Sequence, residues 1–184
     1  MLLSARVFAT DGPGPEFDHL VLLIETEERL IADVGFGDSF LEPLRLDAEE
    51  EHAHQGGPYR LTESNSEMVL ERRTKSGWKP KYIFSLTPHR LAEFSAMSEH
   101  HQTSPESPFA GKSVCSLRTP QGRITMTNGK LITTTGEQRE EMEVSSEEDY
   151  RELLKTRFGI ELEEEARVDR LVFSIGPGGP DSER

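Results

Sequence analysis

The chain has 184 residues, enough for one domain or two small ones with a real core. Its 34 acidic residues against 21 Lys and Arg give a net charge of −13, which argues against nucleic acid as a partner. Met1 opens on LLSARVF, with no basic and apolar leader, and the longest apolar run is far short of a membrane span. The single cysteine, Cys115, cannot form an internal disulfide. We therefore expect a cytoplasmic protein without a membrane segment.

Alternating apolar residues predict mainly β structure in the first half. The stretch LLSARVF already has the pattern of a strand, so the chain looks like one that starts in mid-fold. After a turn at residues 11–15, apolar runs at 19–24 and 30–34 predict two strands. YRLTES and MVLERR predict a hairpin around residues 64–67, and Ser76-Gly77 turns the chain into the strand WKPKYIFSL.

A helix is predicted to open at Pro88 and continue through HRLAEFSAMSEHH, because Leu91, Phe94 and Met97 recur at helical spacing. Three short strands follow at residues 113–118, 123–126 and 131–134. The pair Asn128-Gly129 between the last two is the strongest short hairpin signal in the sequence.

The last predicted element is a second helix, EEDYRELLKTRF. Ser145 and Glu148 match the spacing of a capping box that opens it, and Gly159 is placed to close it. Beyond it, the final residues GPGGPDSER predict a loose tail.

The stretch FDHLVLLIETEERLIADVGFG has two residues that a buried strand rarely carries, His19 and Asp33. If residues 26–28 form a three-residue loop, His19 and Asp33 are diagonal neighbours on one side of the sheet. Their Cα atoms would then be roughly 7–8 Å apart, a gap that side chains can bridge. A two-residue loop would place them on opposite faces. The sequence alone leaves this register open.

A His–Asp pair on a sheet suggests proton transfer. An aspartate that accepts a hydrogen bond from one imidazole nitrogen fixes the tautomer and leaves the other nitrogen to take a proton from a nucleophile. A structural hydrogen bond, or a solvated histidine beside a turn aspartate, also explains these residues. The pattern by itself does not decide between these interpretations.

Several motifs together point to one family. The chain contains, in this order, the motifs SARVF, HLVLLI, LIADVGFG, YIFSLTP, EFSAMSEHHQTSPESPF, CSLRTPQGRITM and FGIEL. In this order they resemble the arylamine N-acetyltransferase family, and the resemblance covers nearly the whole chain. Each motif alone is weak, whereas the set is highly specific.

The resemblance implies an α+β, mainly β fold. It consists of an antiparallel β-barrel at residues 1–98, a small α/β lid at 99–175 and a flexible tail at 176–184. This is a cysteine-protease-like acetyltransferase fold without its N-terminal helical domain. We therefore expect a truncated chain that exposes apolar surface and is marginally stable, self-associating or dependent on a partner segment.

In that family a cysteine, a histidine and an aspartate form a catalytic triad, and His19 and Asp33 match the last two. The family usually has Thr before the histidine, whereas this chain has Asp18, and its effect on the imidazole depends on where its carboxylate points. No segment matches the family's nucleophilic cysteine. Cys115 occupies an ordinary strand position, where a free cysteine is typically a small core residue.

The resemblance also assigns binding residues. Phe36 matches the aromatic residue beside the acceptor pocket, although core packing explains it equally well. Gly35 and Gly37 permit tight backbone geometry next to the aspartate. A loop whose family counterpart meets CoA supplies three hydroxyls, from Thr103, Ser104 and Ser107.

The implied activity is acetyl transfer from acetyl-CoA to an arylamine or arylhydrazine by a ping-pong mechanism. The resemblance also implies a role in xenobiotic metabolism. Without a nucleophile, the chain alone is expected to be inactive. The alternative is a non-catalytic barrel that binds CoA or another ligand. No metal is expected, because His52-x-His54 and His100-His101 lack a fixed third ligand.

Overall fold

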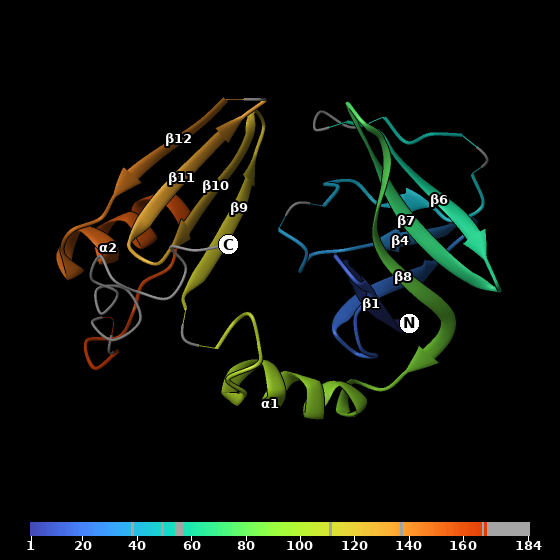
Figure 1. Cartoon of the computed structure of the whole chain (residues 1–184), viewed down its shortest axis with the longest axis horizontal. Helices are drawn as coiled ribbons and strands as arrows, with labels where there is room; N and C mark the ends of the chain where they lie inside the picture. Colours follow the sequence, from blue (N-terminus) through green and yellow to red (C-terminus); the bar gives the residue numbers. More distant parts are fainter. Residues whose placement is uncertain are drawn as a thin grey trace. The chain divides into compact units, whose positions relative to one another are not determined.

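The computed structural model describes residues 1–37, 39–48, 50–53, 57–110, 112–136, 138–166 and 168. The chain divides into two compact units, Met1–His101 and Gln102–Arg184 (Figure 1). The domain boundary predicted at residue 98 lies within helix α1, Ser95–Thr103. The predicted tail, 176–184, is outside the described residues. Within the described part of the chain, no helix is long and apolar enough to cross a membrane.

The first unit contains an antiparallel sheet in the order β5-β4-β3-β1-β8-β7-β6, with β2 paired to β1. Its strands are β1 (Leu2–Ala9), β2 (Gly12–Pro13), β3 (His19–Glu25), β4 (Arg29–Ala32), β5 (Leu44–Arg45), β6 (Tyr59–Ser64), β7 (Glu67–Thr74) and β8 (Gly77–His89). The expectation of a mainly β, barrel-like fold is confirmed, in the form of an open half-barrel.

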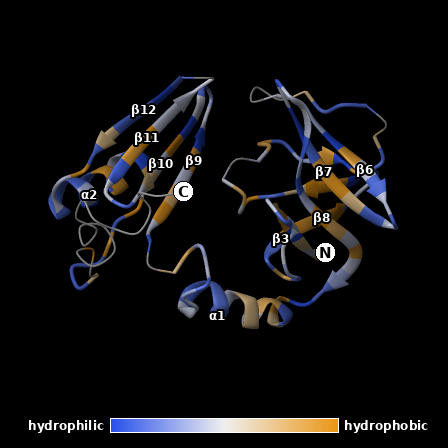
Figure 2. Ribbon diagram, in the orientation of Figure 1, coloured by the Kyte–Doolittle hydropathy of each residue, from blue (hydrophilic) through white to orange (hydrophobic). Residues whose placement is uncertain are grey.

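The core of this unit follows from strand alternation. Leu3 and Ala5 of β1, and Val21 and Leu23 of β3, are buried on one side of the sheet. Tyr59, Leu70, Tyr82 and Phe84 from the β6–β8 meander belong to the same cluster. Figure 2 shows a hydrophobic stretch along β7. The apolar side of the sheet forms the core beneath the His–Asp site.

The hairpin of β3 and β4 has the three-residue loop on which the His–Asp prediction depends. Glu25 lies opposite Arg29 and Leu22 opposite Ala32. Within the loop, the amide of Thr26 donates to the carbonyl of Glu28 at 3.1 Å. This register puts His19 and Asp33 on one face of the sheet.

The first helical segment starts later than predicted. Strand β8 continues through Pro88, which lies opposite Leu3 of β1. The helical part consists of the 3₁₀ turn η1, Leu91–Phe94, followed by α1. The prediction of a helix opening at Pro88 was wrong. Proline fits an extended strand as well as a first helical turn, and pairing with β1 decides between them here.

The second unit has a four-stranded antiparallel sheet in the order β12-β11-β10-β9. Its strands are β9 (Val114–Thr119), β10 (Gly122–Thr127), β11 (Lys130–Thr135) and β12 (Gln138–Glu143). Asn128 and Gly129 both have positive φ, 45° and 72°, which confirms the predicted two-residue hairpin. The described core includes Met126, Leu131 and Tyr150.

Helix α2, Glu147–Leu153, continues into the π-helical turn η2, Leu154–Phe158, and Gly159 ends it with φ of 70° as predicted. The predicted cap is wrong by one residue. Ser146, rather than Ser145, is the N-cap, because its Oγ accepts from the amide of Asp149 at 3.1 Å.

Candidate active site

His19 and Asp33 lie at the adjacent ends of two paired strands. His19 is the first residue of β3, and Asp33 follows the last residue of β4. Nε2 of His19 is 3.0 Å from Oδ2 of Asp33. The histidine side chain is 12% exposed and the aspartate side chain 0%. The structure brings the two predicted residues into direct contact, with the histidine accessible and the carboxylate beneath it.

The second oxygen of Asp33 is held by the backbone of the DVGFG turn. Its Oδ1 accepts from the amides of Gly35 and Phe36, each at 3.1 Å. Burial by itself raises the pKa of Asp33. The hydrogen bond and charge of His19 and the two amides outweigh burial, so the pKa is lowered overall. Asp33 is therefore a carboxylate at neutral pH and orients the imidazole through Nε2.

Tyr82 of β8 lies behind this pair, and no motif in the sequence pointed to it as a site residue. Its ring lies 5.4 Å from that of His19, centroid to centroid, and its side chain is fully buried. Burial, followed by the nearby Asp33 carboxylate, raises the pKa of Tyr82 well above its ordinary value. Among the described residues no partner meets hydrogen-bond geometry with its hydroxyl, although Asp33 and the hydroxyl of Ser39 lie close enough to affect its pKa. Tyr82 is thus a neutral phenol next to the buried carboxylate.

Phe36 is placed between core and site. Its ring is 5.4 Å from that of His19 and 5.8 Å from that of Tyr82, and the side chain packs against the core cluster. Both interpretations of Phe36, core residue and pocket wall, are consistent with this position. On its other side, Nζ of Lys81 lies 5.5 Å from the ring centroid.

Gly35 is constrained by the histidine. A Cβ atom at this position would be 3.3 Å from Cε1 of His19, closer than an ordinary contact. A side chain here would therefore push against the imidazole. Gly37 is exposed and belongs to the same turn, and its predicted role stays a prediction.

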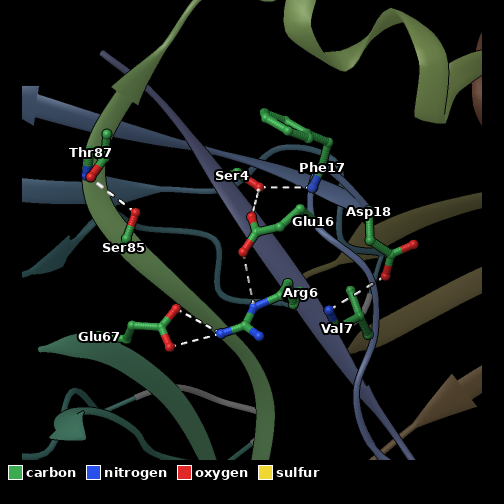
Figure 3. Close-up of polar contacts among 9 residues, drawn as sticks. All are labelled: Ser4, Arg6, Val7, Glu16, Phe17, Asp18, Glu67, Ser85 and Thr87. Atoms are coloured by element: carbon green, nitrogen blue, oxygen red, sulfur yellow. Dashed lines mark hydrogen bonds and ion pairs between the residues drawn. The ribbon is translucent and has the colours of Figure 1, made fainter. Parts of the chain in front are cut away.

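Asp18 points away from the imidazole. Its Oδ1 is 3.0 Å from Nε2 of His101 on α1, and its Oδ2 accepts from the amide of Val7 at 3.4 Å (Figure 3). Asp18 precedes the first residue of β3, and the contacts of its carboxylate are with β1 and α1. The extra carboxylate thus anchors neighbouring elements and does not join the His–Asp pair.

The chain enters β3 through a polar network that the sequence did not suggest. Ser4 donates to Oε2 of Glu16 at 2.7 Å and accepts from the amide of Phe17 at 2.8 Å (Figure 3). Arg6 contacts Glu16 and also both carboxylate oxygens of Glu67. Phe17 has a positive φ of 65°, rare for an aromatic residue. The network fixes a strained backbone two residues before His19.

Cys115 lies on β9 in the second unit and packs against the cluster around Met126. Burial raises the pKa of its thiol. A half-buried, protonated thiol is a poor nucleophile, because the thiolate is the reactive form. The structure places Cys115 as a core-edge residue.

The serine hydroxyls of the predicted CoA loop accept hydrogen bonds from backbone amides two residues further on. Thr103 is the last residue of α1. Oγ of Ser104 accepts from the amide of Glu106 at 3.3 Å, and Oγ of Ser107 accepts from the amide of Phe109 at 3.1 Å. Their predicted contact with CoA stays a prediction.

Of the histidines considered as metal ligands, His52 has Nε2 at 3.2 Å from the carbonyl of Arg45, and His54 lies outside the described residues.

Sequence comparisons with known proteins match the chain to one family. The model of the N-acetyltransferase family matches residues 1–167. Arylamine N-acetyltransferase 2 of Mesocricetus auratus is 31% identical, over 88% of this chain and 65% of its own length. The pineal gland isozyme NAT-3 of Gallus gallus is 28% identical with the same coverage. The chain thus spans just under two thirds of these relatives' length.

Solved structures of arylamine N-acetyltransferases also superpose on this chain. The arylamine N-acetyltransferase of Salmonella typhimurium superposes with a TM-score of 0.78 at 28% identity, covering 86% of this chain and 60% of that one. The Mycobacterium marinum enzyme in complex with CoA superposes with a TM-score of 0.75 at 25% identity, covering 86% and 61%. The chain belongs to the arylamine N-acetyltransferase family, as its motifs predicted.

Proposed function

We propose that this chain supplies the histidine and aspartate of a Cys-His-Asp acetyltransferase, with a cysteine other than Cys115 as nucleophile. The observation that carries the proposal is the 3.0 Å contact between His19 and Asp33, at the positions that match the family's triad. The raised pKa of Cys115 supports a nucleophile from another segment. Acetyl-CoA is the proposed acetyl donor, consistent with the relative solved in complex with CoA.

The proposed first half-reaction forms an acetyl-enzyme. With Nε2 donating to Asp33, Nδ1 of His19 is free to take the proton of the cysteine thiol. The thiolate attacks the thioester carbonyl of acetyl-CoA. The C–S bond to CoA breaks, and the departing CoA sulfur receives the proton from Nδ1. Asp33 stabilises the imidazolium that exists between these two transfers.

The proposed second half-reaction acetylates an arylamine or arylhydrazine. The amine nitrogen attacks the enzyme thioester, Nδ1 accepts its proton, and the cysteine sulfur leaves. Phe36, beside the imidazole, is proposed to pack against the aromatic ring of the acceptor, with Gly35 and Gly37 keeping the turn open. The hydroxyls of the CoA loop are proposed to contact the donor. A xenobiotic role and a cytoplasmic location also stay proposals.

The alternative is a barrel that binds CoA or another ligand without turning it over. One observation favours it for this chain acting alone: the only thiol has a raised pKa in an apolar setting. The two functions differ in whether a supplied cysteine becomes acetylated in a His19-dependent way.

The decisive experiment is complementation. The chain is co-expressed with the part of the Salmonella typhimurium enzyme that it does not match, and the pair is incubated with acetyl-CoA and an arylamine. We expect acetylated amine, and an acetyl adduct on the supplied cysteine by intact mass. His19→Ala should abolish both. Cys115→Ala, the matched control, should leave both unchanged.

Two outcomes would contradict the proposal. One is an adduct on this chain alone that Cys115→Ala removes, which would make Cys115 the nucleophile. The other is amine acetylation that His19→Ala leaves intact. A complemented pair that binds acetyl-CoA but forms neither adduct nor product would favour the non-catalytic alternative.

A further inference from the structure

Backbone pairing between β1 and β3 ends at the candidate catalytic histidine. The last pair is Ala5 of β1 opposite His19, next to Ser4 opposite Leu20. Just before His19 a side chain takes over from the backbone, because the amide of Phe17 donates to Oγ of Ser4 at 2.8 Å (Figure 3). The course of the chain into His19 therefore depends on a side-chain hydroxyl and not on the backbone ladder alone.

The hydroxyl of Ser4 has little freedom to turn. Ser4 is buried, and its Oγ donates its single proton to Oε2 of Glu16 at 2.7 Å. A lone pair of Oγ is thereby directed at the amide of Phe17. The carboxylate of Glu16 lies 3.4 Å from Nε of Arg6, whose Nη2 contacts both carboxylate oxygens of Glu67 at 2.7 Å (Figure 3). Side chains of β1 and β7 thus hold the acceptor that Phe17 uses.

Phe17 meets this acceptor in a conformation that a residue with a side chain rarely adopts. Its φ is 65°, in the left-handed region that a Cβ atom disfavours. Its ring packs edge-on against His89 and Phe94, with centroids 5.0 and 5.1 Å away. Without the bond to Ser4, we expect the backbone of Phe17 to relax toward an extended conformation and to displace His19, two residues later.

A displacement of His19 would not be followed by its partner. Asp33 is held separately, since its Oδ1 accepts from the amides of Gly35 and Phe36. The 3.0 Å contact between Nε2 of His19 and Oδ2 of Asp33 therefore depends on where β3 begins. Displacements of about 1 Å are enough to impair a reactive geometry.

We propose that Ser4 is a positioning residue for His19, acting through the positive-φ conformation of Phe17. Its importance for acetyl transfer rests on the proposed function. Its effect on the contact between His19 and Asp33 is a property of this chain alone.

The test measures the Nε2 proton of His19 by ¹H–¹⁵N NMR of the full chain. A hydrogen bond to a buried carboxylate slows the exchange of this proton with water, so we expect Ser4→Ala to speed the exchange by about tenfold or more. Glu16→Ala leaves the buried serine in place and removes only the acceptor that orients its hydroxyl. It should speed the exchange by about threefold.

Phe17→Gly tests the route of the effect. Glycine adopts positive φ without strain, so in a Phe17→Gly background Ser4→Ala should change the exchange rate by less than about twofold. Leu70→Val is the matched control, because it shortens a buried core side chain of β7 outside the network. It should lower the thermal unfolding midpoint as Ser4→Ala does, without changing the exchange rate.

An unchanged exchange rate in Ser4→Ala, or an increase equal to that in Leu70→Val, would overturn the proposal and leave Ser4 a structural role. An increase that is as large in the Phe17→Gly background would overturn the route through Phe17.

Activity of the complemented pair separates this proposal from the proposed function. We expect Ser4→Ala to lower kcat by about tenfold with the KM for acetyl-CoA unchanged. An unchanged kcat would overturn the link between Ser4 and acetyl transfer. Faster exchange in Ser4→Ala, together with an inactive complemented wild-type pair, would reject the proposed function and leave the positioning of His19 by Ser4 standing.

Discussion

Each unit removes one reactive group at least partly from solvent, and the pKa values of the two groups respond in opposite ways. Burial raises the pKa of both Asp33 and Cys115. Asp33 also accepts from His19 and from two backbone amides, and its pKa ends up lowered. The pKa of Cys115 is raised by burial, with no contribution from a hydrogen-bond donor, and it stays raised. The donors around a buried group, rather than its depth, decide whether it is charged.

The largest expected effect comes from removing the charge of Asp33. Asp33→Asn keeps the size of the side chain but removes its charge, and its amide NH₂ group must face either Nε2 of His19 or the two backbone amides. We expect the free energy of unfolding at pH 7 to fall by about 3 kcal/mol, as when one partner of a buried pair is lost. Urea denaturation measures it. Asp47→Asn, at an exposed pair with Arg29, is the matched control and should cost far less.

The pH dependence of this difference tests its electrostatic origin. Because the folded pKa of Asp33 is lowered, its stabilising contribution is complete above the unfolded pKa and is lost as pH falls through the folded pKa. The gap between wild type and Asp33→Asn should therefore be constant from neutral pH to about pH 5 and shrink below about pH 4. A gap that persists unchanged into acid would mean that packing, not charge, causes the loss.

A smaller effect is expected from Gly35→Ala, which tests how tightly the turn fits the imidazole. The added Cβ would lie 3.3 Å from Cε1 of His19 and must displace the ring. We expect a loss of about 1 kcal/mol, at the low end for an overpacked site, and a change in the His19 ring signals by NMR. In a His19→Ala background the loss should disappear. A loss that is the same in both backgrounds would assign it to the backbone instead.

The site was predictable to the extent that strand periodicity determines it. A three-residue loop puts His19 and Asp33 on one face, and only the choice of loop length was missing from the sequence. Tyr82 could not be found in this way. It lies on β8, far along the chain, and reaches the site because β8 pairs with β1 and β1 with β3. Pairings of that range leave no local pattern.

The fold was predictable where local signals agree with tertiary pairing. Asn128-Gly129 marked a hairpin because both residues take positive φ without strain. Strand β12 was missed because all six of its residues, QREEME, are exposed. Such an edge strand has no apolar side to reveal it, and its charges protect the edge from pairing with other chains.

The smallest expected effect concerns the thiol, and it sharpens the contrast with Asp33 most directly. Alkylation by iodoacetamide follows the thiolate fraction, so the raised pKa of Cys115 predicts a slower rate at pH 7 than that of glutathione. The rate should keep rising past about pH 9, where an ordinary thiol begins to level off. A rate that levels off below pH 8 would instead reveal donors or cations around the sulfur. Cys115 would then resemble Asp33 in its surroundings, and the thiol would return as a candidate nucleophile.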